Sequence, residues 1–280
     1  MKKATLIAGI SALALTLSAC ASYDQEDTAE KADDAKIMAS AEAPLCTDMG
    51  PQTPRDISSV TGLNMDDFAM APASTEMNLC NIHTHTNAEH KGPGFSTFVN
   101  ATDYGGYACN GTADLTEAEL TPAPGAYGKV KPGDTIEVHW VHTSCDIDPG
   151  EGLGSCLSET CTNPLLRVEA QTFLVVNDPN ALDFTEMDYR GYEVNGLDQP
   201  KMIPSNTGQP VVFRGSTTGP SYNQSVCSPL KVTWSVRPQC AKLDINSLHR
   251  WAEDGNVFNE TASHGVRQLV TAPELLSPIE

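Results

Sequence analysis

The sequence predicts a mainly β domain behind a short N-terminal leader. Runs of β-branched and aromatic residues of strand length recur along the chain, and 21 glycines and 19 prolines interrupt them throughout its 280 residues. Patterns of helical period are sparse. We therefore expect many short strands joined by turns, with a few short helices at the periphery.

The first segment, residues 1–19, has the pattern of a secretory signal peptide. Two lysines precede a short apolar run that ends in Leu-Ser-Ala-Cys at positions 17–20. The run is shorter than the roughly 20 apolar residues that span a membrane. The four residues resemble the lipobox of bacterial lipoproteins, which implies cleavage before Cys20 and its acylation. The alternative is an ordinary signal peptide with Cys20 as a plain thiol. Because the two residues directly after Cys20 are Ala21 and Ser22 and neither is aspartate, we expect an outer-membrane lipoprotein facing the periplasm.

Residues 20–45 are the lipidated cysteine and an acidic tether, and residues 46–280 form one domain. After Tyr23 the tether has no aromatic residue and cannot bury enough apolar surface to fold, so we expect it to be disordered. The remaining stretch is long enough for a substantial core. The formal charge of -19 disfavours nucleic acid and anionic lipid as partners, which leaves the lipid anchor as the expected membrane contact.

The cysteine count predicts disulfide bonds. Apart from Cys20 there are eight cysteines, an even number in a chain expected to be exported. A thiolate metal site is the alternative, but the sequence has no Cys-x-x-Cys pair. Eight cysteines allow 105 pairings, so the connectivity stays open. The disulfide candidates are Cys46, Cys80, Cys109, Cys145, Cys156, Cys161, Cys227 and Cys240.

The individual elements follow from local patterns. Apolar and β-branched runs predict strands over residues 81–85, 135–142, 170–176, 211–213 and 231–236. The best helical pattern covers residues 244–251, with Asp244 placed to cap it. A short acidic turn over residues 116–120 has Thr116 as its cap.

Two strands carry a candidate metal site. Residues two apart on a strand point to the same face, so His83 and His85 present two imidazoles side by side. A catalytic zinc uses three protein ligands and one water, which requires a third ligand from elsewhere. The strand over residues 135–142 offers His139 on one face and His142 on the other.

His139 is the preferred third ligand because Glu137 shares its face. A carboxylate beside a ligating imidazole fixes the tautomer of the ring and raises its basicity. Val141 lies on the same face and would line an apolar pocket. His142 is interpreted as a core histidine with a hydrogen bond. His249 and His264 have no neighbouring candidate ligands in the sequence, and we interpret them as structural or exposed.

These histidine blocks carry a family resemblance. The His-x-His at 83–85, the Glu-His at 89–90 and the Glu-x-His-x-x-His at 137–142 resemble, in the same order, the blocks of alpha-class carbonic anhydrases. Gly-Ser-Thr-Thr at 215–218 and Val-Thr-Trp at 232–234 resemble a turn and a strand of that class. The string over residues 80–92 is most similar to the delta class, and the sequence is identified as a member of it, from Cys80 to near the C-terminus.

The resemblance implies a large, twisted, mostly antiparallel sheet with a few short peripheral helices. It also implies reversible hydration of CO2 to bicarbonate and a proton, through hydroxide on one Zn2+ per chain. In this reading His83, His85 and His139 hold the zinc, and Glu137 orients His139. Thr217 would donate its hydroxyl proton to Glu89 and orient the hydroxide. Pocket-lining positions are Val141, Thr218 and Trp234.

The sequence departs from the alpha class in four respects. The spacing from His85 to Glu89 is shorter, and that from Thr217 to Trp234 is longer. The sequence also lacks a residue between Ser216 and Thr217, and it has no histidine between Cys46 and Leu79, where that class has its proton shuttle. We therefore expect proton release to rely on buffer or on a carboxylate. The alternatives are a non-enzymatic zinc-binding or structural lipoprotein of the same fold, and a zinc hydrolase acting on esters. The sequence has no histidine run that would favour metal capture, and all three ligand positions are histidine.

Overall fold

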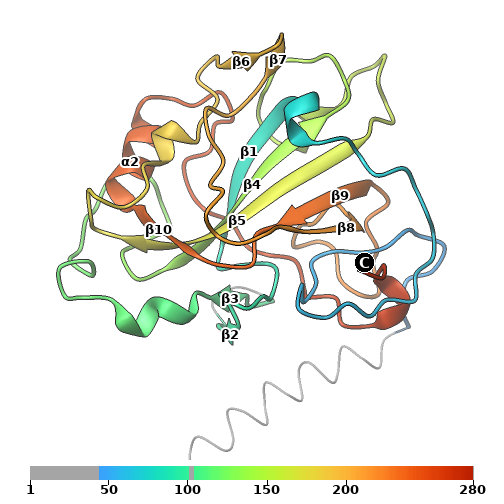
Figure 1. Cartoon of the computed structure of the whole chain (residues 1–280), viewed down its shortest axis with the longest axis horizontal. Helices are drawn as coiled ribbons and strands as arrows, with labels where there is room; N and C mark the ends of the chain where they lie inside the picture. Colours follow the sequence, from blue (N-terminus) through green and yellow to red (C-terminus); the bar gives the residue numbers. More distant parts are fainter. Residues whose placement is uncertain (1–43, 101–103, 280) are drawn as a thin grey trace, which may run out of the picture. The chain divides into compact units, whose positions relative to one another are not determined.

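The computed structural model describes residues 44–100 and 104–279, and most of its regular structure is β-strand (Figure 1). The strands are β1 (Asn78–Thr86), β2 (Thr97–Phe98), β3 (Tyr107–Ala108), β4 (Thr135–Thr143), β5 (Leu166–Val176), β6 (Glu193–Val194), β7 (Leu197–Asp198), β8 (Val211–Ser216), β9 (Lys231–Val236) and β10 (Ala241–Asp244). Within this part of the chain α2 (Ile245–Glu253) is the one α-helix. The 3₁₀-helices are η1 (Ser74–Glu76), η2 (Asn110–Asp114), η3 (Leu153–Cys156), η4 (Phe184–Glu186) and η5 (Pro273–Leu275). The predicted mainly β class is confirmed.

One six-stranded mixed sheet organises the domain. Its order is β1-β4-β5-β9-β8, and β10 also pairs with β5. The pairs β1–β4, β4–β5 and β8–β9 are antiparallel, whereas β5–β9 and β10–β5 are parallel. Every predicted strand is present, and the largest difference in a boundary is at β5, which begins four residues earlier than predicted. Strands β2–β3 and β6–β7 form two small separate ladders.

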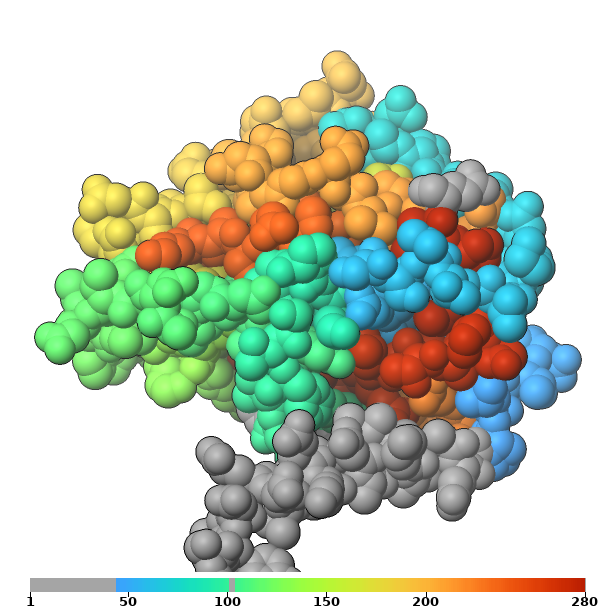
Figure 2. Space-filling model, turned by 60° about the horizontal axis from the view of Figure 1, so that its bottom comes forward, coloured from blue at the N-terminus to red at the C-terminus, as the bar shows by residue number. Residues whose placement is uncertain are grey.

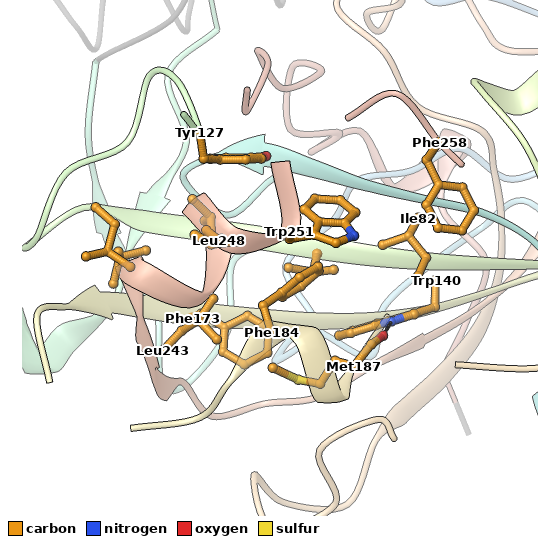
Figure 3. Packing of buried hydrophobic residues seen from close by; sticks show 14 of the residues in the cluster. Ile82, Tyr127, Trp140, Phe173, Phe184, Met187, Leu243, Leu248, Trp251 and Phe258 are labelled. Atoms are coloured by element: carbon orange, nitrogen blue, oxygen red, sulfur yellow. Dashed lines mark hydrogen bonds between the residues drawn. The ribbon is translucent and has the colours of Figure 1, made fainter. Parts of the chain in front are cut away.

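One face of the sheet is covered by α2. The helix buries Ile245, Leu248 and Trp251, which recur at a spacing of three residues and so lie on one face. Figure 3 shows Trp251 against Phe184, and the two ring centroids are 4.5 Å apart. This cluster also contains Trp140 from the centre of β4. The helix therefore fixes the side of β4 that points away from the candidate histidines.

The ends of α2 show how closely the sequence predicts it. Asp244 is the N-cap residue, as predicted, but its side chain accepts no hydrogen bond from the helix backbone. Instead Asp244 Oδ1 accepts from Asn246 Nδ2 at 2.9 Å. The helix stops just before Gly255, whose φ of +72° suits glycine and closes the C-terminus. Thr116 caps its predicted turn, since its Oγ1 accepts from Glu119 N at 3.3 Å.

A second apolar cluster lies on the opposite face of the sheet. It contains Val141 from β4, Val168 and Ala170 from β5, and Trp234 from β9. All nine residues of β4 are buried, so this strand is covered on both sides. The alternation of Trp140 and Val141 between the two clusters is the period of two expected of a strand. The candidate histidine His139 shares the face of Val141.

An N-terminal arm and the C-terminal segment run side by side without forming strands. Residues 44–72, blue in Figures 1 and 2, lie against residues 265–279, drawn in red. Main-chain hydrogen bonds join them, including Gln52 N to Leu275 O at 2.7 Å and Ile279 N to Val60 O at 3.0 Å. Gly62 permits the close approach, because a Cβ there would lie 2.2 Å from the carbonyl group of Ser277. These contacts fix the C-terminal segment, which contains Gly265, the hydrogen-bond partner of the His85 ring.

Four disulfides close the domain, which confirms that the eight cysteines pair. The connectivity that the sequence leaves open is Cys46–Cys227, Cys80–Cys156, Cys109–Cys240 and Cys145–Cys161. Cys80 lies on β1 and Cys156 ends η3, so this disulfide fixes the loop that follows β4 to the strand of the candidate ligands.

The predicted signal peptide, Cys20 and residues 21–43 of the predicted tether lie outside the described residues. Within the described part of the chain, no helix has the length and apolar character needed to cross a membrane. The acylation of Cys20 and the outer-membrane location stay predictions.

Candidate metal centre

The pairing of β1 with β4 brings the three predicted histidines together. In this antiparallel register His83 lies directly opposite His139, and His85 lies opposite Glu137. His83 and His85 are two residues apart and share a face. The ring centroids of the three histidines are 4.7–5.1 Å apart. Each ring offers one nitrogen within 4.8 Å of the others, which is close enough to hold a single metal ion.

The remaining ring nitrogens are turned toward fixed partners. His83 Nδ1 lies 2.6 Å from Asn81 Oδ1, and His85 Nδ1 lies 3.2 Å from the carbonyl oxygen of Gly265. Both contacts place a proton on Nδ1 and leave Nε2 with a free lone pair. His85 Nε2 is buried and has no hydrogen-bond partner within the described residues, as expected of an atom that awaits a metal.

His139 has the opposite orientation. Its Nδ1 lies 3.2 Å from His83 Nε2, and its Nε2 lies 3.6 Å from Glu137 Oε1. The proton therefore belongs on Nε2, facing the carboxylate, and Nδ1 faces the other two rings. Three imidazole nitrogens within 4.8 Å of one another fit Zn2+, which takes imidazole ligands and low coordination numbers.

Burial keeps the three rings neutral. It lowers the pKa of His85 to about 3, and it lowers the pKa of His83 well below its usual range. Burial also lowers the pKa of His139, although the adjacent Glu137 opposes that effect. Neutral imidazole is the form that binds a metal, so the site is in its ligating state at neutral pH.

Glu137 contacts two further residues of the site besides His139. Its Oε1 accepts from His90 Nδ1 at 2.8 Å, and its Oε2 accepts from the backbone N–H of Glu89 at 2.5 Å and of His90 at 3.3 Å. Burial opposes the charge, but His90 and His139 outweigh it and hold the pKa of Glu137 well below its usual range. Glu137 is therefore an anion that ties His139 to the 89–90 turn.

Glu89 lies beside the ligands but does not contact Thr217 as the resemblance implies. Its Oε1 is 3.5 Å from His85 Nδ1 and accepts from Arg267 N at 2.9 Å. Glu89 Oε2 has no partner within the described residues, and burial raises the pKa of this carboxyl. Thr217 Oγ1 instead shares a 2.5 Å hydrogen bond with Ser228 Oγ.

The three histidines line a cavity of about 300 Å³. One wall is apolar and includes Val141, Val168 and Trp234, and another includes Thr217 and Thr218. The predicted pocket positions therefore line one cavity with the three histidines. Trp234 is fixed from behind, since its Nε1 donates to Ser216 O at 2.9 Å.

His142 lies away from this cavity. It is buried on the other face of β4, and its Nδ1 is 3.2 Å from Trp140 O. That position matches its interpretation as a core histidine with a hydrogen bond. The predicted role of His139 rather than His142 in the triad follows from this alternation of faces.

Sequence reasoning missed several residues of the site. Asn81 could have been found, because it precedes His83 by two positions on the same strand face. His264 had no such signal, since it joins the site through a bridge with His85, far away in sequence. The His264 ring stacks on His83 at a centroid distance of 5.7 Å, and 46% of its side chain is exposed at the cavity. Gly265 and Arg267 follow it in the same segment.

Comparison with known proteins gives one family match. Residues 74–247 match the family model described as delta carbonic anhydrase, and this range covers most of the chain and all three histidines. The search among curated proteins gave no match.

Solved structures give distant similarities. An alpha-carbonic anhydrase from Thermovibrio ammonificans, in complex with the inhibitor sulfanilamide, is 15% identical, with 78% of this chain and 87% of that chain covered and a TM-score of 0.26. A hyperthermostable carbonic anhydrase from an active hydrothermal vent chimney is 13% identical, with 79% and 88% covered and a TM-score of 0.24. The Photobacterium profundum alpha-carbonic anhydrase is 16% identical, with 79% and 91% covered and a TM-score of 0.24.

Proposed function

The chain belongs to the delta carbonic anhydrase family, and we propose that it hydrates carbon dioxide reversibly on one zinc ion held by His83, His85 and His139. The observation that carries the proposal is the triad itself: the buried rings of His85 and His139 and the partly buried ring of His83 lie on two paired strands, and each offers one nitrogen within 4.8 Å of the other two. Zinc bound there lowers the pKa of a coordinated water to about 7, which provides a nucleophile at neutral pH.

The protein's contribution begins with the orientation of the ligands. Asn81 and the carbonyl of Gly265 hold the Nδ1 protons of His83 and His85, and Glu137 faces Nε2 of His139. Each ring thus has its tautomer fixed before a metal arrives. Because all three ligands are neutral, they would leave a bound zinc ion its full positive charge.

The apolar wall supports the choice of substrate. Carbon dioxide is small and has no net dipole, so it is held by apolar contacts rather than by hydrogen bonds. Val141, Val168 and Trp234 provide such contacts beside the histidines, and they exclude water from that side of the cavity. Thr217 and Thr218 also line the cavity, and their hydroxyls can hydrogen-bond to bicarbonate.

The cavity also provides carboxylates for proton release. Glu151 and Glu260 line it and could accept a proton, which supports the proposal that protons leave through buffer or a carboxylate. We retain the proposal that the enzyme is exported and anchored through Cys20. The four disulfides of the domain support export, because such bonds form and persist in oxidising compartments.

The test is stopped-flow hydration of CO2 by the purified full-length protein, with zinc content measured on the same samples. We expect one zinc per chain and fast turnover, and we expect His139→Ala to lose more than the roughly 10- to 100-fold that loss of a supporting partner costs. His142→Ala is the matched control, since it removes a buried histidine from the other face of the same strand. A folded, zinc-loaded wild-type protein without hydration activity would contradict the proposal and favour a zinc-binding or structural role.

A further inference from the structure

Arg267 is a buried cation whose guanidinium, within the described residues, has no hydrogen bond to a carboxylate. Arg267 is 1% exposed, and burial lowers its pKa to about 10. Within the described residues its guanidinium donates only to neutral oxygens: Ser216 Oγ at 3.1 Å, Thr217 O at 3.4 Å, Gln52 Oε1 at 2.9 Å and Asn223 O at 3.1 Å. Burying a charge in this way is costly, so the arrangement needs an explanation.

Ser216, Thr217 and Asn223 belong to a loop that lines the cavity. Gln52 lies outside that loop but binds it. The loop runs from the end of β8 at Ser216 to the start of β9 at Lys231 and has no regular structure. Arg267 binds it at its beginning and again at Asn223. Gln52 extends the attachment, since its Oε1 also accepts from Ser228 N at 2.9 Å. Ser228 in turn contacts the Thr217 hydroxyl at 2.5 Å.

The main chain of Arg267 contacts Glu89, which lies beside the histidine ligands. Arg267 N donates to Glu89 Oε1 at 2.9 Å, and Glu89 lies 3.5 Å from the His85 ring. Gly265, two residues earlier, accepts from His85 Nδ1. The backbone of Arg267 thus contacts Glu89, and its side chain contacts Ser216 and Thr217.

We propose that Arg267 is a positioning residue, which fixes the Thr217 wall at a set distance from Glu89 and the histidine ligands. The inference rests on the proposed function, since it assigns Arg267 a role in CO2 hydration through Thr217. Arg267 lies beyond the part of the chain that matches the family model, in a segment connected to the site only through tertiary contacts. A planar guanidinium can reach Ser216, Thr217, Gln52 and Asn223 together, whereas a lysine ammonium cannot span them in one plane.

A purely structural role is the competing explanation, and Arg55 provides the matched control. Arg55 is 0% exposed, and burial lowers its pKa to about 10 as well. Its guanidinium also donates to neutral carbonyl oxygens, those of Ser277, Ser59 and Thr61, and none of these lines the cavity. Arg267→Met and Arg55→Met therefore remove similar buried groups, but only the first releases Thr217.

The experiment measures kcat/KM for CO2 hydration, zinc affinity and melting temperature in wild type, Arg267→Met, Arg267→Lys and Arg55→Met. We expect both Arg267 variants to lose roughly 10- to 100-fold in kcat/KM, the cost of misplacing a positioned group by about 1 Å, with zinc affinity unchanged. Arg55→Met should lower the melting temperature and leave kcat/KM within about twofold of wild type. Arg267→Lys keeps the positive charge on a slightly shorter side chain, so it is the second variant to measure if Arg267→Met fails to fold.

A double-mutant cycle tests whether Arg267 affects CO2 hydration through Thr217. If Arg267 acts through Thr217, adding Arg267→Lys to Thr217→Ala should cost little more than Thr217→Ala alone. Full additivity of the two losses, or an Arg267→Lys protein with wild-type kcat/KM, would overturn the inference while leaving the proposed function intact. An inactive wild-type enzyme would instead remove the proposed function itself, so the two failures are distinguishable.

Discussion

Replacement of Glu137 by glutamine tests whether this carboxylate supports the metal ligand. Its two oxygens accept from His90 Nδ1, from the backbone N–H groups of Glu89 and His90, and face His139 Nε2 at 3.6 Å. An amide has one accepting oxygen and one NH2 group. In Glu137→Gln the NH2 group must therefore face a buried donor, and the negative charge beside His139 is lost.

The expected magnitudes follow from these contacts. Leaving one buried donor unpaired costs about 1–3 kcal/mol of folding free energy. Loss of the partner of a zinc-ligating imidazole lowers metal affinity roughly 10- to 100-fold, which corresponds to about 1.4–2.8 kcal/mol at the metal. Glu137→Gln should thus fold, melt at a lower temperature and bind zinc more weakly, with the three histidines unchanged.

The assay is competition for zinc against a coloured chelator, on folded protein at neutral pH. Glu169→Gln is the matched control, because Glu169 is a buried carboxylate on the neighbouring strand β5 that pairs with Arg167 and Arg237 rather than with a histidine. The control should lose stability and keep its zinc affinity. Equal zinc affinities for Glu137→Gln and wild type would refute the assignment of Glu137 to the support of His139.

Two further predictions concern stability. Replacing Cys80 and Cys156 by alanine should lower the free energy of unfolding by about 1.4 kcal/mol more than replacing Cys145 and Cys161. The two disulfides span 76 and 16 residues, and the loop entropy grows with the logarithm of that number. Denaturant unfolding of both double variants measures the difference, and equal losses would contradict the prediction. Burial opposes ionisation of Glu169, but Arg167 and Arg237 outweigh it and lower its pKa below 4.5. Its contribution is therefore present above pH 4.5 and is lost as the pH falls through the lower pKa of the folded state. Glu169→Gln should destabilise the protein at pH 7 and lose less stability on acidification than wild type does, and an identical pH dependence of unfolding in the two proteins would sink this prediction.

The sequence predicts best those features that depend on the alternation of a strand. The period of two places His83 with His85 and separates His139 from His142, and the structure has all four on the expected faces. It does not predict which strands pair. His83 lies opposite His139 because β1 and β4 are neighbours in an antiparallel register, a choice that the packing of the whole sheet decides.

Contacts from irregular segments were beyond prediction. Gly265 and Arg267 reach the site from a stretch without strand or helix, and no periodicity marks them. The disulfide pairs were unpredictable for the same reason, since eight cysteines are compatible with many connectivities and only the fold brings specific pairs together. Sequence reasoning therefore found the candidate metal ligands and missed most of the residues that hold them in place.

The hydroxyl of Thr217 shows why that distinction matters for the chemistry. The resemblance implies that Thr217 donates to Glu89, yet its hydrogen bond runs to Ser228, from the far end of the same loop. Glu89 Oε2 is left buried and unpartnered, a costly state for a carboxylate unless it is protonated or gains a donor. Both groups are held by contacts of Arg267, its backbone on Glu89 and its guanidinium on the Thr217 carbonyl. The relation between threonine and glutamate in this enzyme is therefore set by a residue outside the recognisable motifs, and motif matching alone cannot assign it.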